Sequence, residues 1–277
     1  MKKISDFSQK SPILFSLAFT VLVLIVHELF ANFFYLLPET TGVYIVNEVV
    51  FIIWPLVLVV LFGYRFIFRQ KGFGATLGAG LPSFLLFGAM LIGTMLSLVN
   101  NPATEWKSTS EIVLGILMLI GVGFREEILY RGVITNAIAR KYGNSKKGLW
   151  ITVLTSGAMF GAMHLANVFH NVSFGGSLVQ ALSAFGTGIL FCAIYLRGGS
   201  IWAVALLHSL INAAGAADVL LVNGLGDLTS VIEGIGLHNV VYILVDLLLV
   251  AFLMRKSKRQ KMIDRIQQMY SDLVANN

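Results

Sequence analysis

Residues 112 to 135 read IVLGILMLIGVGFREEILYRGVIT, a long apolar segment interrupted by charged residues. At a rise of about 1.5 Å per residue, a helix of this length crosses a hydrocarbon core of about 30 Å. Four charged residues nevertheless stand inside it, namely Arg125, Glu126, Glu127 and Arg131. Each ionisable side chain costs at least about 2.5 kcal/mol at the centre of a bilayer. The stretch therefore predicts a membrane helix whose charges face other protein groups.

The rest of the chain carries the same apolar character. Hydrophobic residues make up 57% of the 277 positions and charged residues 12%, with a mean hydropathy of +0.81. A soluble domain usually has about a quarter of its residues charged. Apolar runs of roughly twenty residues recur and predict an all-α, polytopic membrane bundle of about eight transmembrane helices. The predicted spans are residues 12–37, 43–68, 81–99, 112–135, 149–169, 178–196, 200–222 and 238–254.

Lysine and arginine fall on one side of this predicted topology. Of the 20 basic residues, 17 lie in loops and tails on the side of the two termini, and only Lys107 lies in the opposite loops. The positive-inside rule then predicts cytoplasmic termini in a cell membrane, with no cleaved signal peptide before the first span. The net charge of +6 follows the topology, so no nucleic-acid partner is expected, and the basic tail after Met254 is expected on anionic lipid.

Three helices carry polar pairs spaced one turn apart. Glu127 and Arg131 stand at i and i+4, so they can form an ion pair and leave Glu126 free as a general base. Phe160 shares a helical face with His164, and His208 shares one with Asn212. Taken singly, each pair also fits a structural role, as a charge clamp or as hydrogen-bonded packing between helices. Together they predict one pocket, in or near the cytoplasmic half of the membrane.

The order of these motifs resembles a known family. Glu126-Glu127-x-x-x-Arg131, Phe160-x-x-x-His164 and His208-x-x-x-Asn212 are similar to the motifs of the CAAX protease and bacteriocin-processing (Abi) family, which includes type II CAAX prenyl endopeptidases. The resemblance implies that Glu126 and His164 activate a water and that His208 and Asn212 stabilise the oxyanion. It further implies that Glu127, Arg131 and Phe160 support the site.

The resemblance also suggests how the chain is divided. Residues 1–109 are expected to form N-terminal transmembrane helices and residues 110–216 a CAAX-protease-like catalytic core. Residues 217–254 are expected to hold the last transmembrane helix, and residues 255–277 a basic amphipathic cytoplasmic tail. The short loops and the lack of added domains suit a prokaryotic member.

The expected function is an intramembrane endopeptidase, acting in bacteriocin maturation or self-immunity. Its expected partners are the lipid bilayer and a membrane-associated peptide or protein substrate, and nothing in the sequence indicates an oligomeric state. No cofactor is expected, because the His-Glu-x-x-His spacing of zinc peptidases is absent; zinc held by the motif carboxylates and histidines is the alternative. A membrane scaffold or immunity protein that acts by binding, and a small transporter, are the alternative functions.

Other polar residues in the spans are expected to make contacts between helices or to mark span boundaries. They are His27, Glu28, Glu48, Asp218 and Asp246, while His170 is expected to be exposed at a span end.

Overall fold

Serine side chains set where several of the helices begin. Ser108 accepts a hydrogen bond from the backbone N–H of Glu111, and the Glu111 carboxylate accepts one from the backbone N–H of Ser108. This capping box opens α5 (Thr109–Glu127), and such a cap stabilises a helix by about 1 kcal/mol. Three further serine caps are Ser145 before α7 (Lys146–Met163), Ser173 before α8 (Phe174–Gly198) and Ser200 before α9 (Ile201–Leu221).

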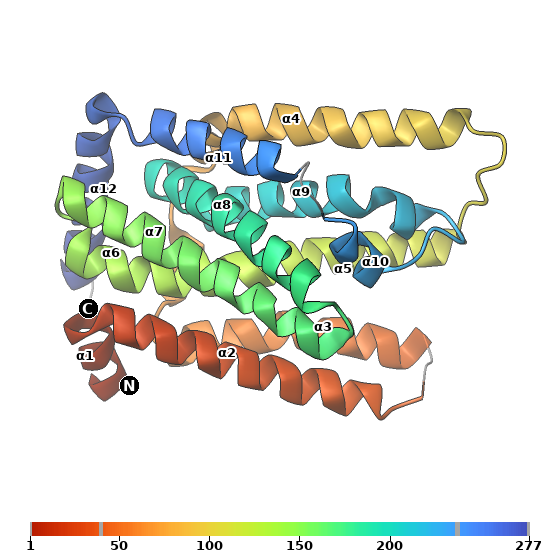
Figure 1. Ribbon diagram of the computed structural model, residues 1–277. Coiled ribbons are helices and arrows are strands. Elements are labelled where there is room, and N and C mark those ends of the chain that lie inside the picture. Colours follow the sequence, from red (N-terminus) through yellow and green to blue (C-terminus); the bar gives the residue numbers. More distant parts are fainter. Residues whose placement is uncertain (1, 39–40, 236–238, 276–277) are drawn as a thin grey trace.

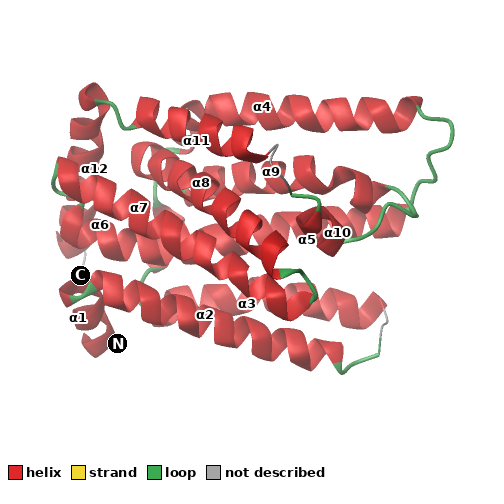
Figure 2. Ribbon diagram, in the orientation of Figure 1, coloured by secondary structure: helices red, strands yellow, loops and turns green. Residues whose placement is uncertain are grey.

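The computed structural model describes residues 2–38, 41–235 and 239–275, and in these ranges the chain forms a bundle of helices joined by short loops (Figures 1 and 2). Apart from an isolated bridge between Trp106 and Val222, the regular structure of the described residues is helical. The remaining elements are α1 (Lys2–Lys10), α2 (Pro12–Tyr35), α3 (Thr41–Leu61), η1 (Arg65–Arg69), α4 (Phe73–Asn100), η2 (Ile128–Thr135), α6 (Asn136–Tyr142), η3 (His164–His170), α10 (Leu228–Glu233), α11 (Asn239–Leu253) and α12 (Lys256–Ala275).

Six described helices are long and apolar enough to cross a membrane. They are Pro12–Tyr35, Gly42–Leu61, Phe73–Asn100, Lys146–His170, Phe174–Gly198 and Ile201–Leu221. Residues 112–135, the apolar stretch that contains four charged residues, lie in a continuous helical path formed by α5, η2 and α6. Val240–Leu253 is a shorter apolar helix, and the predicted span 238–254 begins at a residue outside the described ranges. The chain is thus an all-helical membrane protein.

Two predicted span boundaries are wrong by several residues. The span predicted over 43–68 ends at Leu61, because Gly63 adopts a left-handed φ of 82°. There the N–H of Tyr64 bonds the carbonyl of Val59 and the N–H of Gly63 bonds that of Val60, which is a Schellman motif. The span predicted over 81–99 begins earlier, at Phe73, directly after the left-handed Gly72.

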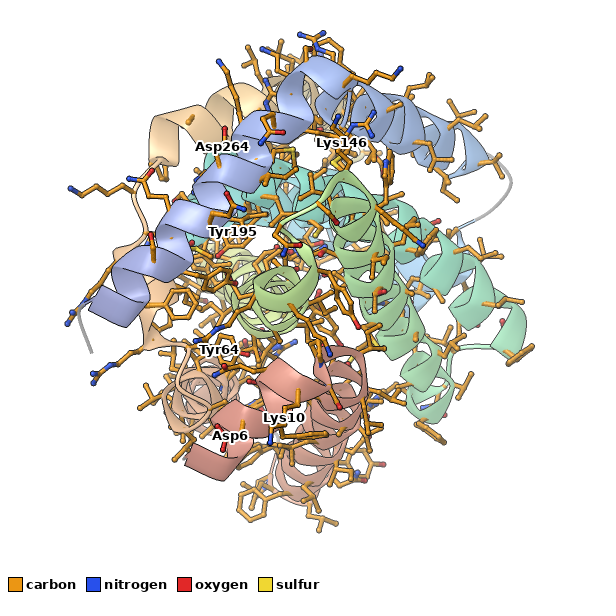
Figure 3. The ribbon with its side chains drawn as sticks, turned by 90° about the vertical axis from the view of Figure 1, so that its left-hand side faces the viewer. Asp6, Lys10, Tyr64, Lys146, Tyr195 and Asp264 are labelled. Carbon is orange, nitrogen blue, oxygen red and sulfur yellow. The ribbon has the colours of Figure 1, made fainter. Side chains whose placement is uncertain are left out.

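Both chain ends lie at the same end of the bundle (Figure 1). Figure 3 looks onto this basic end, where Lys10 and Lys146 lie and where α12 runs across the ends of the other helices. The apolar face of α12 packs on protein, since Met262, Ile263 and Ile266 are buried in the bundle core. The apolar face of the tail therefore contacts protein, while the contact of its basic residues with anionic lipid stays a prediction.

Small residues bring the helices that carry the motifs into close contact. A Cβ on Gly123 in α5 would lie 2.5 Å from Ser209 Oγ in α9, and one on Gly161 in α7 would lie 2.7 Å from the carbonyl of Ala181 in α8. Any larger side chain at these positions would push the helix pairs apart. The glycines therefore place Glu126 and Glu127 against α9 and His164 beside α8.

Candidate active site

A fully buried ion pair lies at the centre of the bundle. Arg131 Nη1 lies 2.7 Å from Glu127 Oε1, and both side chains have no exposed surface. Arg131 Nη2 donates to the carbonyl of Gly188 in α8 at 3.0 Å, and the guanidinium stacks over the ring of Phe160 at 4.5 Å. The spacing of four residues predicts this pair, and Phe160 supports it by covering the cation.

The helix changes its winding at this pair. α5 ends at Glu127, and the next eight residues, Ile128–Thr135, form a buried π-helix before α6 continues the path. Such wide turns are rare and occur frequently at functional sites. Glu126 and Glu127 therefore stand at the junction between two helical geometries, which the apolar pattern of the sequence does not reveal.

His208 joins the two glutamates. Its Nδ1 lies 2.8 Å from Glu127 Oε1, and its Nε2 lies 3.6 Å from Glu126 Oε2. A carboxylate can only accept at Nδ1, so Glu127 holds that nitrogen protonated and turns Nε2 toward Glu126. Glu127 thus positions His208 as well as Arg131. Glu126 is free of Arg131, as the sequence predicts, but it has His208 as a partner.

His164 is set at a change of helix type. It follows the last residue of α7 and begins the 3-10 helix η3, and its Nδ1 lies 2.9 Å from the carbonyl oxygen of Phe160. A carbonyl can only accept, so Nδ1 is the protonated nitrogen and Nε2 of the neutral ring is left as an acceptor. The Phe160 ring lies between the two histidines, 4.9 Å from His164 and 5.8 Å from His208 between ring centroids.

One cavity of about 350 Å³ collects the motif residues. Glu126, His164, His208 and Asn212 all line it, whereas Glu127 and Arg131 lie behind its wall. Arg125 lines it as well, with its guanidinium over the ring of Phe51 in α3 at 5.1 Å. The structure therefore brings the four predicted catalytic residues to a shared space in which a peptide bond and a water could meet.

The cavity extends beyond the basic half of the bundle, in or near which the sequence predicts the pocket. Its wall includes Val231 and Ile232 of α10 and His170 at the end of η3, which belong to the opposite end of the bundle. α10 is fastened there by Glu233, whose carboxylate accepts hydrogen bonds from the backbone N–H and the hydroxyl of Ser173. These bonds hold the pKa of Glu233 below its usual value. The cavity therefore extends from the predicted site, in or near the basic half, toward the opposite end of the bundle.

Residues that the sequence analysis set aside also line this cavity. His27 and Glu28 of α2 face it together with His170, Asn167 and Gln180. His170 is partly exposed, as expected, but its Nε2 lies 3.0 Å from Glu28 Oε1. The sequence does contain a signal for this contribution, because His27 and Glu28 are adjacent ionisable residues in the middle of an apolar run. Burying each of them in a membrane costs free energy, so their presence indicates a function or a partner.

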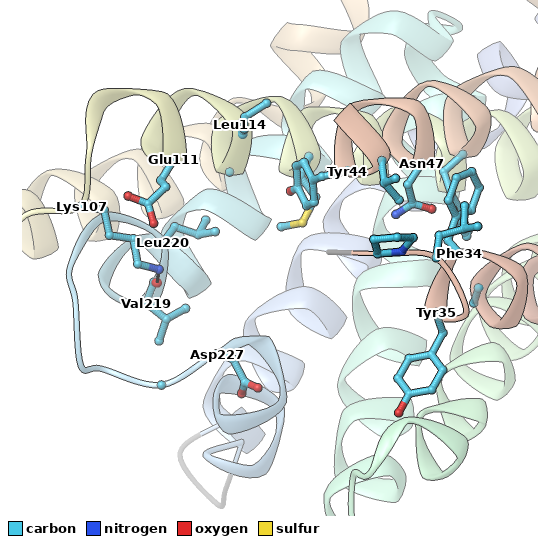
Figure 4. Close-up of a pocket in the computed structure, with 18 residues that line it drawn as sticks. Phe34, Tyr35, Tyr44, Asn47, Lys107, Glu111, Leu114, Val219, Leu220 and Asp227 are labelled. Atoms are coloured by element: carbon cyan, nitrogen blue, oxygen red, sulfur yellow. Dashed lines mark hydrogen bonds between the residues drawn. The ribbon is translucent and has the colours of Figure 1, made fainter. Parts of the chain in front are cut away.

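A larger cavity of about 840 Å³ lies between α3, α5 and α9 toward the opposite end (Figure 4). Tyr44, Lys107 and Glu111 line it, and Lys107 Nζ donates to the carbonyl of Val219 at 2.6 Å. It contains none of the four predicted catalytic residues, although Met118 lines both cavities. The motif chemistry therefore belongs to the smaller cavity.

Ionisable side chains around one cavity inside a polytopic membrane bundle mark a functional site. Residues 108–214 match the family model described as Type II CAAX prenyl endopeptidase Rce1-like. This segment is therefore similar to the CAAX protease family, and the match supports a CAAX-type intramembrane protease. No curated protein and no solved structure matches the chain significantly.

Proposed function

We propose that this protein is an intramembrane endopeptidase that cleaves a membrane-associated peptide or protein with a water activated by Glu126 and His164. The observation that carries the proposal is the shared cavity of Glu126, His164, His208 and Asn212. The match of residues 108–214 to the CAAX endopeptidase family model supports the same reaction class.

In the proposed reaction Glu126 takes a proton from water while the water oxygen attacks the carbonyl carbon of the scissile bond. His164 orients that water through Nε2, because Nδ1 is engaged by the carbonyl of Phe160. The proton then passes to the leaving amine as the C–N bond breaks, so that Glu126 acts first as base and then as acid.

Negative charge on the carbonyl oxygen is stabilised by the side-chain amide of Asn212 and by His208, which donates from Nε2 in the form that carries a proton on both ring nitrogens, the form that a carboxylate beside each nitrogen favours. Donors that are already oriented in a site with little water are worth about 3–4 kcal/mol each in the transition state. Glu127 fixes His208 for this role through the 2.8 Å contact at Nδ1. His208 Nε2 lies 3.6 Å from Glu126 Oε2, so the proposed donor to the substrate oxygen stands next to the proposed base.

We further propose a setting for the reaction. The basic end of the bundle faces the cytoplasm, the protein resides in a prokaryotic cell membrane, and its substrates are bacteriocin precursors or other membrane-associated peptides and proteins. The placement of Lys10 and Lys146 at the same end as both termini supports this orientation. The reaction is proposed to need no metal, the alternative being a zinc ion held by the motif residues.

The test is cleavage by purified full-length protein in lipid nanodiscs. The protein is incubated with a library of membrane peptides, including prenylated carboxyl-terminal peptides, and products are read by mass spectrometry. Glu126→Gln keeps the shape and hydrogen bonding of the side chain but removes the base, so cleavage should fall by about 10²–10⁴-fold while the folded state persists. His164→Ala should lower cleavage in the same direction.

Two outcomes would overturn the proposal. If Glu126→Gln and His164→Ala both keep wild-type function in cells, the protein acts by binding, as a scaffold or immunity protein would. If a chelator abolishes cleavage and zinc restores it in a His170→Ala background, the reaction uses a metal at the motif residues.

A further inference from the structure

A second group of chemically active side chains lies on the wall of the same cavity. His27 and Glu28 of α2 meet His170, the last residue of η3, and a donor atom of each lies within 4.8 Å of the others. His170 Nε2 and Glu28 Oε1 are 3.0 Å apart, and the imidazole rings of His27 and His170 lie edge to face with centroids 6.2 Å apart. No motif residue takes part in this group.

We propose that His27, Glu28 and His170 bind a divalent transition-metal ion, with zinc as the preferred ion. Two imidazoles and one carboxylate form a donor set that zinc uses where a fourth position stays open to water. Zinc bonds of about 2.0–2.2 Å in a tetrahedron place the donor atoms roughly 3.3–3.5 Å apart. The donor separations here run from 3.0 Å to at most 4.8 Å, so rotation of the side chains is enough to close the site.

The surroundings suit a bound ion. Imidazole donors favour zinc and similar metals over magnesium or calcium. All three residues line the cavity, so the fourth coordination position can face the cavity and accept a water there. Asn167 donates a hydrogen bond to Gln180 Oε1, and both residues line the same wall, where their amides can bond a metal-bound water.

The metal would join two distant parts of the chain. Glu28 and His170 are 142 positions apart, and α2 lies outside residues 108–214, which match the family model. An ion at this position ties α2 to η3, the 3-10 helix that begins at His164. The proposed site is therefore a property of this chain that the family match does not include.

Binding is measured on full-length protein that carries a histidine-free affinity tag and has been stripped with a chelator. Titration with zinc chloride by calorimetry should show one site, and cobalt should give a tetrahedral absorption spectrum. His170→Ala should weaken zinc binding by more than about 100-fold. Loss of a residue that only hydrogen-bonds a metal ligand already lowers metal affinity by about 10–100-fold, and His170 would be a ligand itself. Glu28→Gln removes the charged ligand, so it should weaken binding by at least about 10-fold.

Glu126→Gln and His164→Ala serve as matched controls, because both residues line the same cavity but lie outside the proposed donor set. Zinc affinity should be unchanged in both. The side chains of His170 and Glu28 are 41% and 27% exposed, so their substitution should leave the fold intact, which thermal unfolding and size exclusion verify. The proposal is wrong if wild-type protein binds no stoichiometric zinc, if His170→Ala and Glu28→Gln both bind as wild type does, or if Glu126→Gln abolishes binding.

Discussion

Replacement of Glu127 by alanine should damage stability and activity together. One oxygen of this carboxylate contacts Arg131 at 2.7 Å and His208 at 2.8 Å, and neither Glu127 nor Arg131 has any exposed side-chain surface. Removal of one partner of a buried pair leaves an uncompensated charge, which costs about 3–5 kcal/mol. That is a large part of the roughly 5–15 kcal/mol that holds a typical domain folded.

The assay is thermal unfolding of the purified variants in one detergent, followed by the cleavage measurement in nanodiscs. A loss of this size should lower the melting temperature on the order of 10 °C. Glu126→Ala is the matched control, because its side chain is 17% exposed and its contact with His208 is longer, at 3.6 Å. It removes no partner of Arg131 and should cost only about 1 kcal/mol.

A double variant separates the two roles of Glu127. Glu127→Leu combined with Arg131→Met leaves no buried cation without a partner, so most of the lost stability should return. Cleavage should stay low, because His208 still lacks the acceptor that orients its ring. The reasoning fails if Glu127→Ala melts at the same temperature as Glu126→Ala, or if the double variant regains full cleavage.

Three further predictions concern the oxyanion, α10 and the topology. Asn212→Ala should lower kcat by about 10²–10³-fold with an unchanged melting temperature, and an unchanged kcat would remove this residue from the mechanism. The pKa of Glu233 is lowered in the folded state, so its hydrogen bonds to Ser173 stabilise α10 at any pH above the usual carboxyl pKa. This stabilisation is lost as the pH falls through the folded-state pKa. Hydrogen exchange of α10 should therefore become faster in acid, and this acid dependence should be absent in Glu233→Gln. Reporter fusions at Lys146 should report the cytoplasm and those at Pro102 the outside of the cell. In that orientation the side of the cavity formed by α10 faces the outside of the cell. The reverse result would refute the proposed orientation.

Local spacing predicts part of this site well. The pairing of Glu127 with Arg131 follows from positions one helical turn apart, and the distance between them depends on a single helix. The three motifs also meet in one cavity, as their polar character inside apolar helices indicates. The first inference uses short-range geometry and the second uses the cost of burying charge, and both are properties that a sequence carries directly.

Contacts that depend on several helices are not predicted. His208 reaches Glu126 and Glu127 only because Gly123 allows α5 to approach Ser209 of α9, and this approach has no local signature. The π-helix likewise follows an ordinary apolar pattern. His170 meets α2 because the chain turns into a 3-10 helix after α7, a change that hydropathy does not record.

The docking of α12 sets an order for assembly in the membrane. Tyr270 donates to the carbonyl of Asn136, and Asn136 donates to the carbonyls of Arg131 and Gly132 in the π-helix. Tyr270 leaves the ribosome 134 residues after Asn136, when α7, α8, α9 and α11 have already been made. A chain that ended before Tyr270 would contain the membrane helices but would lack the Tyr270–Asn136 hydrogen bond that supports the π-helix next to Glu126 and Glu127. The contact between α12 and the π-helix can therefore form only after the helices that line the cavity have been synthesised.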